Sequence, residues 1–217
     1  DSWKEISYKA LTPDGANAAF TINPQDGDGK VIFYNLKTNA QDSVKRAAEI
    51  ALSFDSKYAI FKIKPQQNLV KELRRQKKKK EDLPKDSLGI YSFTNRKTQK
   101  VADVKSFKIP EKAGGWVAYQ QDVKKEVKPV ATSGDKKPEN GYTLVLRKLS
   151  NDTETQFGYV KDYAFAKFGQ GLLFSSAGND STMQAGVYWY DLQKEQLTTL
   201  HQGKAKYKYK GLSISEN

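Results

Sequence analysis

The feature of this sequence that most restricts its fold is a phrase that occurs twice with the same internal spacing. Residues 10–20 read ALTPDGANAAF, and residues 51–61 read ALSFDSKYAIF. Looser copies lie at 164–174 and at about 107–119. A repeat of this kind is typical of architectures that bury their cores between neighbouring units. The chain is therefore predicted to be an array of similar modules.

Each copy of the phrase predicts a β-hairpin. Its turn is built on Asp14-Gly15, on Asp55-Ser56 or on residues 169–171 (GQG). Gly accepts a positive φ and Asp bonds its own backbone, so both residue types favour tight turns. A second apolar arm follows each copy, at residues 30–36, 88–93, 142–149 and 186–192.

Two hairpins per unit give a four-stranded sheet about every 40 to 55 residues, which is the size of a propeller blade. The predicted fold class is all-β: a partial β-propeller of about four blades of antiparallel sheet, with one short basic helical insertion. We expect a single propeller fragment over residues 1–217. The predicted blades are 3–46, 47–102, 103–155 and 156–202, with 203–217 as the start of a further blade.

The end of the sequence resembles its beginning. Residues 209–213 (YKGLS) parallel residues 8–12 (YKALT). Two interpretations follow: the chain is a piece of a longer propeller, or its last residues form a closing strand that pairs with the first blade. The first interpretation is favoured.

Much of the net charge of +12 is concentrated in residues 71–80 (KELRRQKKKK). One interpretation is a surface for nucleic acid or another polyanion. The other is a solvated helix with Leu69, Val70 and Leu73 on one face, ended by residues 82–84 (DLP). No aromatic residue interleaves these charges to stack on bases, so the helix is favoured and no nucleic-acid partner is predicted.

The sequence contains no recognisable active site. It lacks the Gly-x-Ser-x-Gly elbow of a serine hydrolase, and its single histidine, His201, is predicted to be a loop residue and not a catalytic base. Residues 26–29 (DGDG) suggest calcium, but Lys37 stands where an EF-hand needs Glu, so a tight turn is favoured. The sequence has no cysteine. No catalytic, cofactor-binding or metal-binding residue, no cofactor and no membrane span is predicted.

Several segments of the chain form a distinctive combination: residues 3–7 (WKEIS), 11–15 (LTPDG), 84–90 (PKDSLGI), 104–107 (VKSF) and 116–119 (WVAY). Together they resemble the N-terminal region of the prolyl oligopeptidase family. The resemblance is closest to exported, dipeptidyl peptidase-like members from Bacteroides-like bacteria.

The resemblance implies a propeller of seven or eight blades above a C-terminal α/β-hydrolase domain that holds a Ser-Asp-His triad. In the family the propeller admits short peptides to the cleft between the domains. This chain is then expected to be the non-catalytic propeller portion of an exported serine peptidase, periplasmic or at the cell surface of a Gram-negative bacterium. Its expected partners are the hydrolase domain and the peptide substrate. No Glu-Glu pair occurs in this sequence, so the family's amine-binding glutamates are not carried over.

The alternative prediction is a stand-alone propeller-like binding module for a protein, peptide or polysaccharide. Strand aromatics are the candidate surface, although alternate positions more often fill a core. Open blade faces also predict self-association. The candidate surface residues are Trp116, Tyr119, Tyr188, Trp189 and Tyr190.

Overall fold

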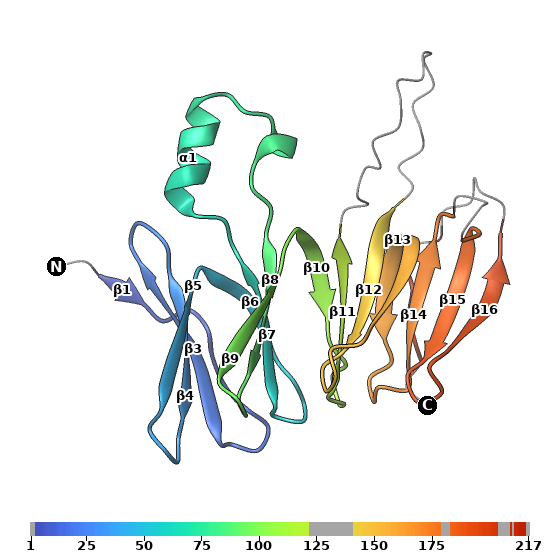
Figure 1. Cartoon of the computed structure of the whole chain (residues 1–217), viewed down its shortest axis with the longest axis horizontal. Helices are drawn as coiled ribbons and strands as arrows, with labels where there is room; N and C mark the ends of the chain where they lie inside the picture. Colours follow the sequence, from blue (N-terminus) through green and yellow to red (C-terminus); the bar gives the residue numbers. More distant parts are fainter. Residues whose placement is uncertain (1–2, 122–140, 179–182, 204–208, 210, 216–217) are drawn as a thin grey trace. The chain divides into compact units, whose positions relative to one another are not determined.

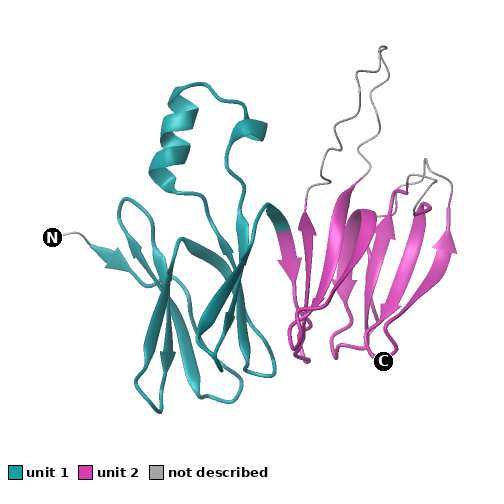
Figure 2. Cartoon of the chain, viewed as in Figure 1, with its two compact units in different colours: residues 1–105 teal, residues 106–217 magenta. Residues whose placement is uncertain are grey.

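The computed structural model describes residues 3–121, 141–178, 183–203, 209 and 211–215. The predicted connection at 121–140 lies outside the described residues except for Gln121. Antiparallel strands form three sheets, and one α-helix is inserted among them (Figure 1). The predicted all-β class and partial propeller are confirmed. The chain divides into two compact units, residues 1–105 and 106–217 (Figure 2).

Unit 1 contains two sheets. In the first sheet β1 and β2 both pair with β3, and β4 and β5 follow in order; in the second sheet the strands are paired in sequence order. The strands of the first sheet are β1 (Lys4–Glu5), β2 (Lys9–Leu11), β3 (Asn17–Pro24), β4 (Lys30–Asn35) and β5 (Gln41–Lys45). Those of the second sheet are β6 (Ala47–Leu52), β7 (Tyr58–Ile63), β8 (Ser87–Ser92) and β9 (Lys97–Val101).

Unit 2 is built on one seven-stranded antiparallel sheet whose strands are paired in sequence order. Its strands are β10 (Val104–Lys108), β11 (Trp116–Gln121), β12 (Tyr142–Lys148), β13 (Glu154–Phe165), β14 (Gly171–Ser176), β15 (Gly186–Asp191) and β16 (Gln196–Gln202). The first half of β13 pairs with β12 and its second half with β14. One long strand therefore serves two blades.

The predicted limit between residues 155 and 156 falls inside β13, whereas the limit between 46 and 47 falls between β5 and β6. The blade limits and the single-fragment description stay predictions.

The repeated phrase folds as the predicted hairpin turn. Thr12 Oγ1 donates a hydrogen bond to Asp14 Oδ1 at 2.6 Å, and Ser53 Oγ donates to Asp55 Oδ1 at the same distance. Gly15 follows with φ at 68°, the left-handed region that Gly tolerates best. The hydroxyl before each turn Asp is thus part of the motif, and the sequence analysis had not assigned it that role.

Each unit buries an aromatic cluster against its sheets. In unit 1 the Phe33 ring stacks on the Tyr91 ring with centroids 4.2 Å apart, so β4 and β8 contact across two sheets. In unit 2 Phe157 and Phe174 lie 4.6 Å apart. Such ring pairs add to the stabilisation from burying apolar area.

The basic insertion forms helix α1 (Gln67–Arg75), followed by a short 3-10 turn (Lys80–Asp82). The predicted helix across 71–80 is wrong at its end, because Lys77 takes a positive φ of 56°. Lysines in succession repel one another and gain little from continuing the helix. Val70 and Leu73 are half-buried as predicted, but Leu69 is 42% exposed.

The 26–29 segment is the predicted turn, between β3 and β4. Its acidic side chains hold α1: Asp28 Oδ1 accepts a hydrogen bond from Gln67 N at 3.0 Å, and Asp26 Oδ1 pairs with Lys71 Nζ at 2.8 Å. The pair with Lys71 lowers the pKa of Asp26.

Candidate functional site

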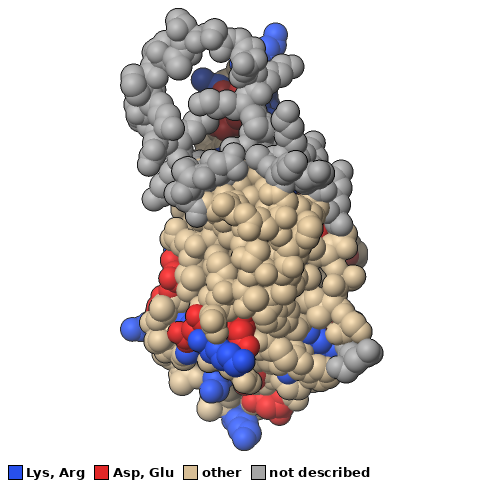
Figure 3. All heavy atoms as spheres, turned by 90° about the vertical axis from the view of Figure 1, so that its right-hand side faces the viewer, with Lys and Arg blue, Asp and Glu red and all other residues tan. Residues whose placement is uncertain are grey.

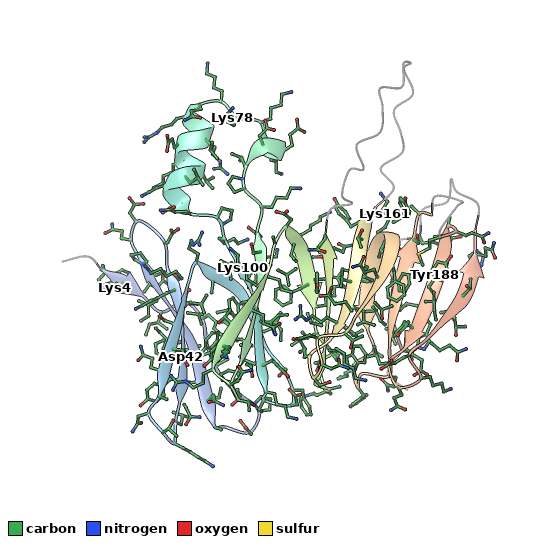
Figure 4. All side chains as sticks on the ribbon, viewed as in Figure 1. Lys4, Asp42, Lys78, Lys100, Lys161 and Tyr188 are labelled. Atoms are coloured by element: carbon green, nitrogen blue, oxygen red, sulfur yellow. The ribbon has the colours of Figure 1, made fainter. Side chains whose placement is uncertain are left out.

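The predicted aromatic surface residues lie on two strands of unit 2. Tyr119 on β11 is 1% exposed, and Tyr188 and Tyr190 on β15 are each 6% exposed. Tyr188 (labelled in Figure 4) and Tyr190 belong to the core of unit 2, and Trp116 packs against that core. Trp189, on the alternate face of β15, is half-buried. The structure therefore does not gather them on one surface, and a partner-binding role stays a prediction.

A charged network that sequence analysis missed lies in unit 1. Asp42 on β5 accepts hydrogen bonds from Arg96 Nε at 2.7 Å, from Arg96 Nη2 at 2.9 Å and from Tyr91 Oη at 2.7 Å (Figure 4 labels Asp42). The hydrogen bonds from Arg96 hold the pKa of Asp42 below its usual value. Burial, with the Asp42 carboxylate beside it, raises the pKa of Tyr91.

This network lines a cavity of about 330 Å³, which is also lined by the aromatic side chains of Phe33, Tyr91 and Phe93. The carboxylate of Asp42 is bound on both oxygens by side chains of the second sheet. Because these charges satisfy one another, the arrangement fits a clamp between two sheets better than a ligand site.

A second network lies in unit 2. Tyr119 Oη donates to Glu154 Oε1 at 2.6 Å, and Arg147 pairs with Asp152 at 2.8 Å and with Glu154 at 3.2 Å. Burial raises the pKa of Tyr119, and the Glu154 carboxylate adds to the shift. Nearby in the sequence, Tyr163 is also buried, which raises its pKa to about 12. These groups stabilise the sheet and offer no nucleophile.

A third charged cluster lies on β7 and its neighbours. Lys62 Nζ contacts Glu49 Oε2 at 2.8 Å, and Lys64 Nζ contacts Asp86 Oδ2 at 2.7 Å. Glu49 sits where β6 shifts register against β7, with φ at 51°. Each cation therefore has a carboxylate within ion-pair distance.

The side of unit 2 that carries β15 and β16 is mostly free of charge. Figure 3 shows Lys, Arg, Asp and Glu gathered toward its lower rim, below a broad uncharged area. Leu197 and Leu200 on β16 are 41% and 57% exposed. His201 lies on the same strand, exposed, with its ring 5.6 Å from the Tyr209 ring.

Over the described ranges of the chain, no group of three or more His, Asp or Glu side chains could hold a metal ion. Within the same ranges, no helix combines the length and the apolar character needed to cross a bilayer.

Comparison with known proteins finds similarity in structure and none in sequence. No family model matches the chain, and no curated protein matches it. A structure from a study of two prolyl endopeptidases has a TM-score of 0.53 at 11% identity, covering 93% of this chain and 30% of that one. An acylaminoacyl peptidase from Pyrococcus horikoshii has a TM-score of 0.50 at 10% identity, covering 92% of this chain and 32% of that one.

The β-propeller domain of the Trilobed protease from Pyrococcus furiosus is also similar, at a TM-score of 0.49 and 10% identity, with 92% of this chain and 58% of that one covered. The chain spans about a third of the length of the two peptidases above. At these identities the similarity shows the fold alone. That fold is a propeller-type all-β array, which this chain shares with the two peptidases above at low sequence identity.

Proposed function

We propose that this chain is the non-catalytic, N-terminal propeller portion of a serine peptidase resembling the prolyl oligopeptidases. In that role it limits access of peptides to a C-terminal α/β-hydrolase domain. The observation that carries the proposal is the fold: nearly the whole chain superposes on a part of two peptidases of this type.

The physical basis of the role is rigidity. Sheets that bury aromatic faces against each other, as at Phe33 and Tyr91, resist deformation. A rigid ring can exclude large substrates without supplying catalytic groups. Export to the periplasm or cell surface, and an origin in Bacteroides-like bacteria, are parts of the proposal that rest on the sequence resemblance.

The experiment compares this chain with the product of its complete reading frame. Both are assayed with proline-containing peptides of increasing length. We expect no hydrolysis by residues 1–217, and hydrolysis of short but not long peptides by the complete protein. Hydrolysis by the chain alone that persists through purification contradicts the proposal, and so does a reading frame without a hydrolase domain. Fractionation of the source cells tests export.

A second candidate function is a stand-alone binding module. It is favoured by the largely uncharged side of unit 2, where the apolar side chains of Leu197 and Leu200 are exposed, because exposed apolar side chains that lie together mark interaction sites. If the chain is a stand-alone binding module, its complete reading frame should encode no hydrolase domain. Sedimentation of the chain over a range of concentrations tests the related prediction of self-association.

A further inference from the structure

Two adjoining cavities lie beside α1 in unit 1. Their volumes are about 540 and 420 Å³, and both are lined by Asp28, Gly29 and Arg46. The first extends toward β1 and the β4–β5 edge, since Lys4, Lys30 and Lys45 line it (Lys4 is labelled in Figure 4). The second extends to α1, where Arg74 lines it. Because they share these residues, the cavities lie next to each other, and we call the two together the basic groove.

The basic groove has an excess of positive charge. Asp28 is the acidic residue among those that line it, and its Oδ1 already accepts the hydrogen bond from Gln67 N. Lys64 and Lys71 are paired with Asp86 and Asp26. The remaining basic side chains make no ion pair or side-chain hydrogen bond with the described part of the chain; they are Lys4, Lys30, Lys45, Arg46 and Arg74.

Arg46 lines both cavities of the groove, and its backbone is held by two hydrogen bonds. Its N–H donates to Gly29 O at 2.7 Å, and its carbonyl accepts from Lys64 N at 2.9 Å. The backbone here is left-handed, with φ at 66°. Asp103, between β9 and β10, and Tyr159, inside the long strand β13, have φ values of 58° and 59°. The left-handed backbone therefore occurs with other side chains at comparable positions, and it does not require an Arg at position 46.

The lining also restricts the kind of anion. Unpaired cations spread over both cavities suit a chain with several negative charges better than a single ion. No aromatic side chain is among the described lining residues, so bases and sugar rings have nothing to stack on. Apolar patches and side-chain amides separate the charges instead, which suits a peptide backbone with small side chains; they are Ile22, Pro24, Pro65 and Val70, with Asn23, Gln66 and Gln67.

We propose that the basic groove binds an extended acidic peptide segment, with a carboxylate held by the Arg46 guanidinium. A guanidinium offers paired N–H donors in the geometry that a carboxylate accepts. The surrounding lysines add positive charge but do not offer this bidentate hydrogen-bond geometry. The site uses residues of unit 1 alone, so it stands whether or not the chain belongs to a peptidase.

The test measures fluorescence anisotropy of a labelled octapeptide of alternating Glu and Val, with the full chain at low salt. We expect binding that weakens as salt is added, because exposed charges are screened. A peptide with Gln in place of every Glu should not bind. Arg46→Gln should weaken binding about ten-fold, which corresponds to the loss of one charge-assisted hydrogen bond.

The matched control removes the same charge elsewhere in unit 1. Lys97 and Lys100 are exposed on β9 and do not line the groove, so K97Q and K100Q should change affinity less than two-fold. Arg74→Gln is a second groove variant, on the exposed side of α1, for use if Arg46→Gln lowers the unfolding midpoint. The proposal is overturned if the groove variants and the control variants lose affinity for the acidic peptide to the same extent, or if the Gln peptide binds. An oligonucleotide of equal charge that binds as tightly as the acidic peptide also overturns it.

Discussion

Truncation of Phe33 tests whether the two sheets of unit 1 are held together by their aromatic cluster. The side chain is 2% exposed, stacks on Tyr91 at 4.2 Å, and lies 5.7 Å from Phe61 and 5.8 Å from Phe93. Phe→Ala in a core costs about 3 to 5 kcal/mol through lost burial and the cavity left behind. Stacking adds about 0.5 to 1.5 kcal/mol per ring pair, so we expect Phe33→Ala to lie at the upper end of that range.

The assay is urea unfolding followed by circular dichroism, with the free energy of unfolding extrapolated to water. Leu36→Ala is the control, because Leu36 directly follows β4 but is 47% exposed, and it should cost less than about 1 kcal/mol. The midpoint of the far-UV transition should lie at a lower urea concentration in Phe33→Ala than in the unaltered chain. A Phe33→Ala variant no less stable than Leu36→Ala would refute the packing argument.

Three further predictions concern the same unit. Gly89→Ala should destabilise by about 1 to 3 kcal/mol, because a Cβ at Gly89 overlaps the Phe61 ring; thermal or urea unfolding measures it. The hydrogen bonds from Arg96 depress the folded-state pKa of Asp42, so its contribution is present above the unfolded pKa of about 3.9 and is lost as pH falls through the folded value. Asp42→Asn should therefore flatten the fall of the unfolding midpoint as pH drops from about 3.9 toward the lower folded-state pKa, and an unchanged pH dependence in that acidic range counts against the network. Tyr91→Phe should cost about 1.5 to 3 kcal/mol, the usual contribution of a hydrogen bond to a charged group, by the same unfolding assay.

The parts of the fold that sequence predicted are those decided by neighbours in the chain. The turn at Asp14-Gly15 needs a residue that tolerates a left-handed backbone, which is Gly15. It also needs a side chain that accepts a hydrogen bond from the nearby backbone, which is Asp14, so both requirements are visible in adjacent residues. The helix was predicted from the spacing of Leu69, Val70 and Leu73 for the same reason, although Leu69 is exposed. Its end at Arg75 was not predicted, because nothing in the lysine run marks a specific stop.

The networks could not be predicted, because they depend on which sheet faces which. Tyr91 and Arg96 lie far along the sequence from Asp42, on strands or turns of another sheet. Alternation along a strand places Tyr188 and Tyr190 on one face of β15. It could not say that this face is the buried one, since that is decided by the packing of β14 and its neighbours.

The repeat itself explains where a specific function can be encoded. Arg46, Asp103 and Tyr159 share one backbone conformation, yet their side chains have nothing in common. The shared part is what folding requires of the backbone, and the side chain is what selection can vary without changing the fold. Arg46 is the first of these positions, and it lies next to α1, the insertion between β7 and β8. Arg46 and α1 together line the basic groove. Departures from the repeat, and not the repeat, are therefore the places where a binding specificity of this chain should be sought.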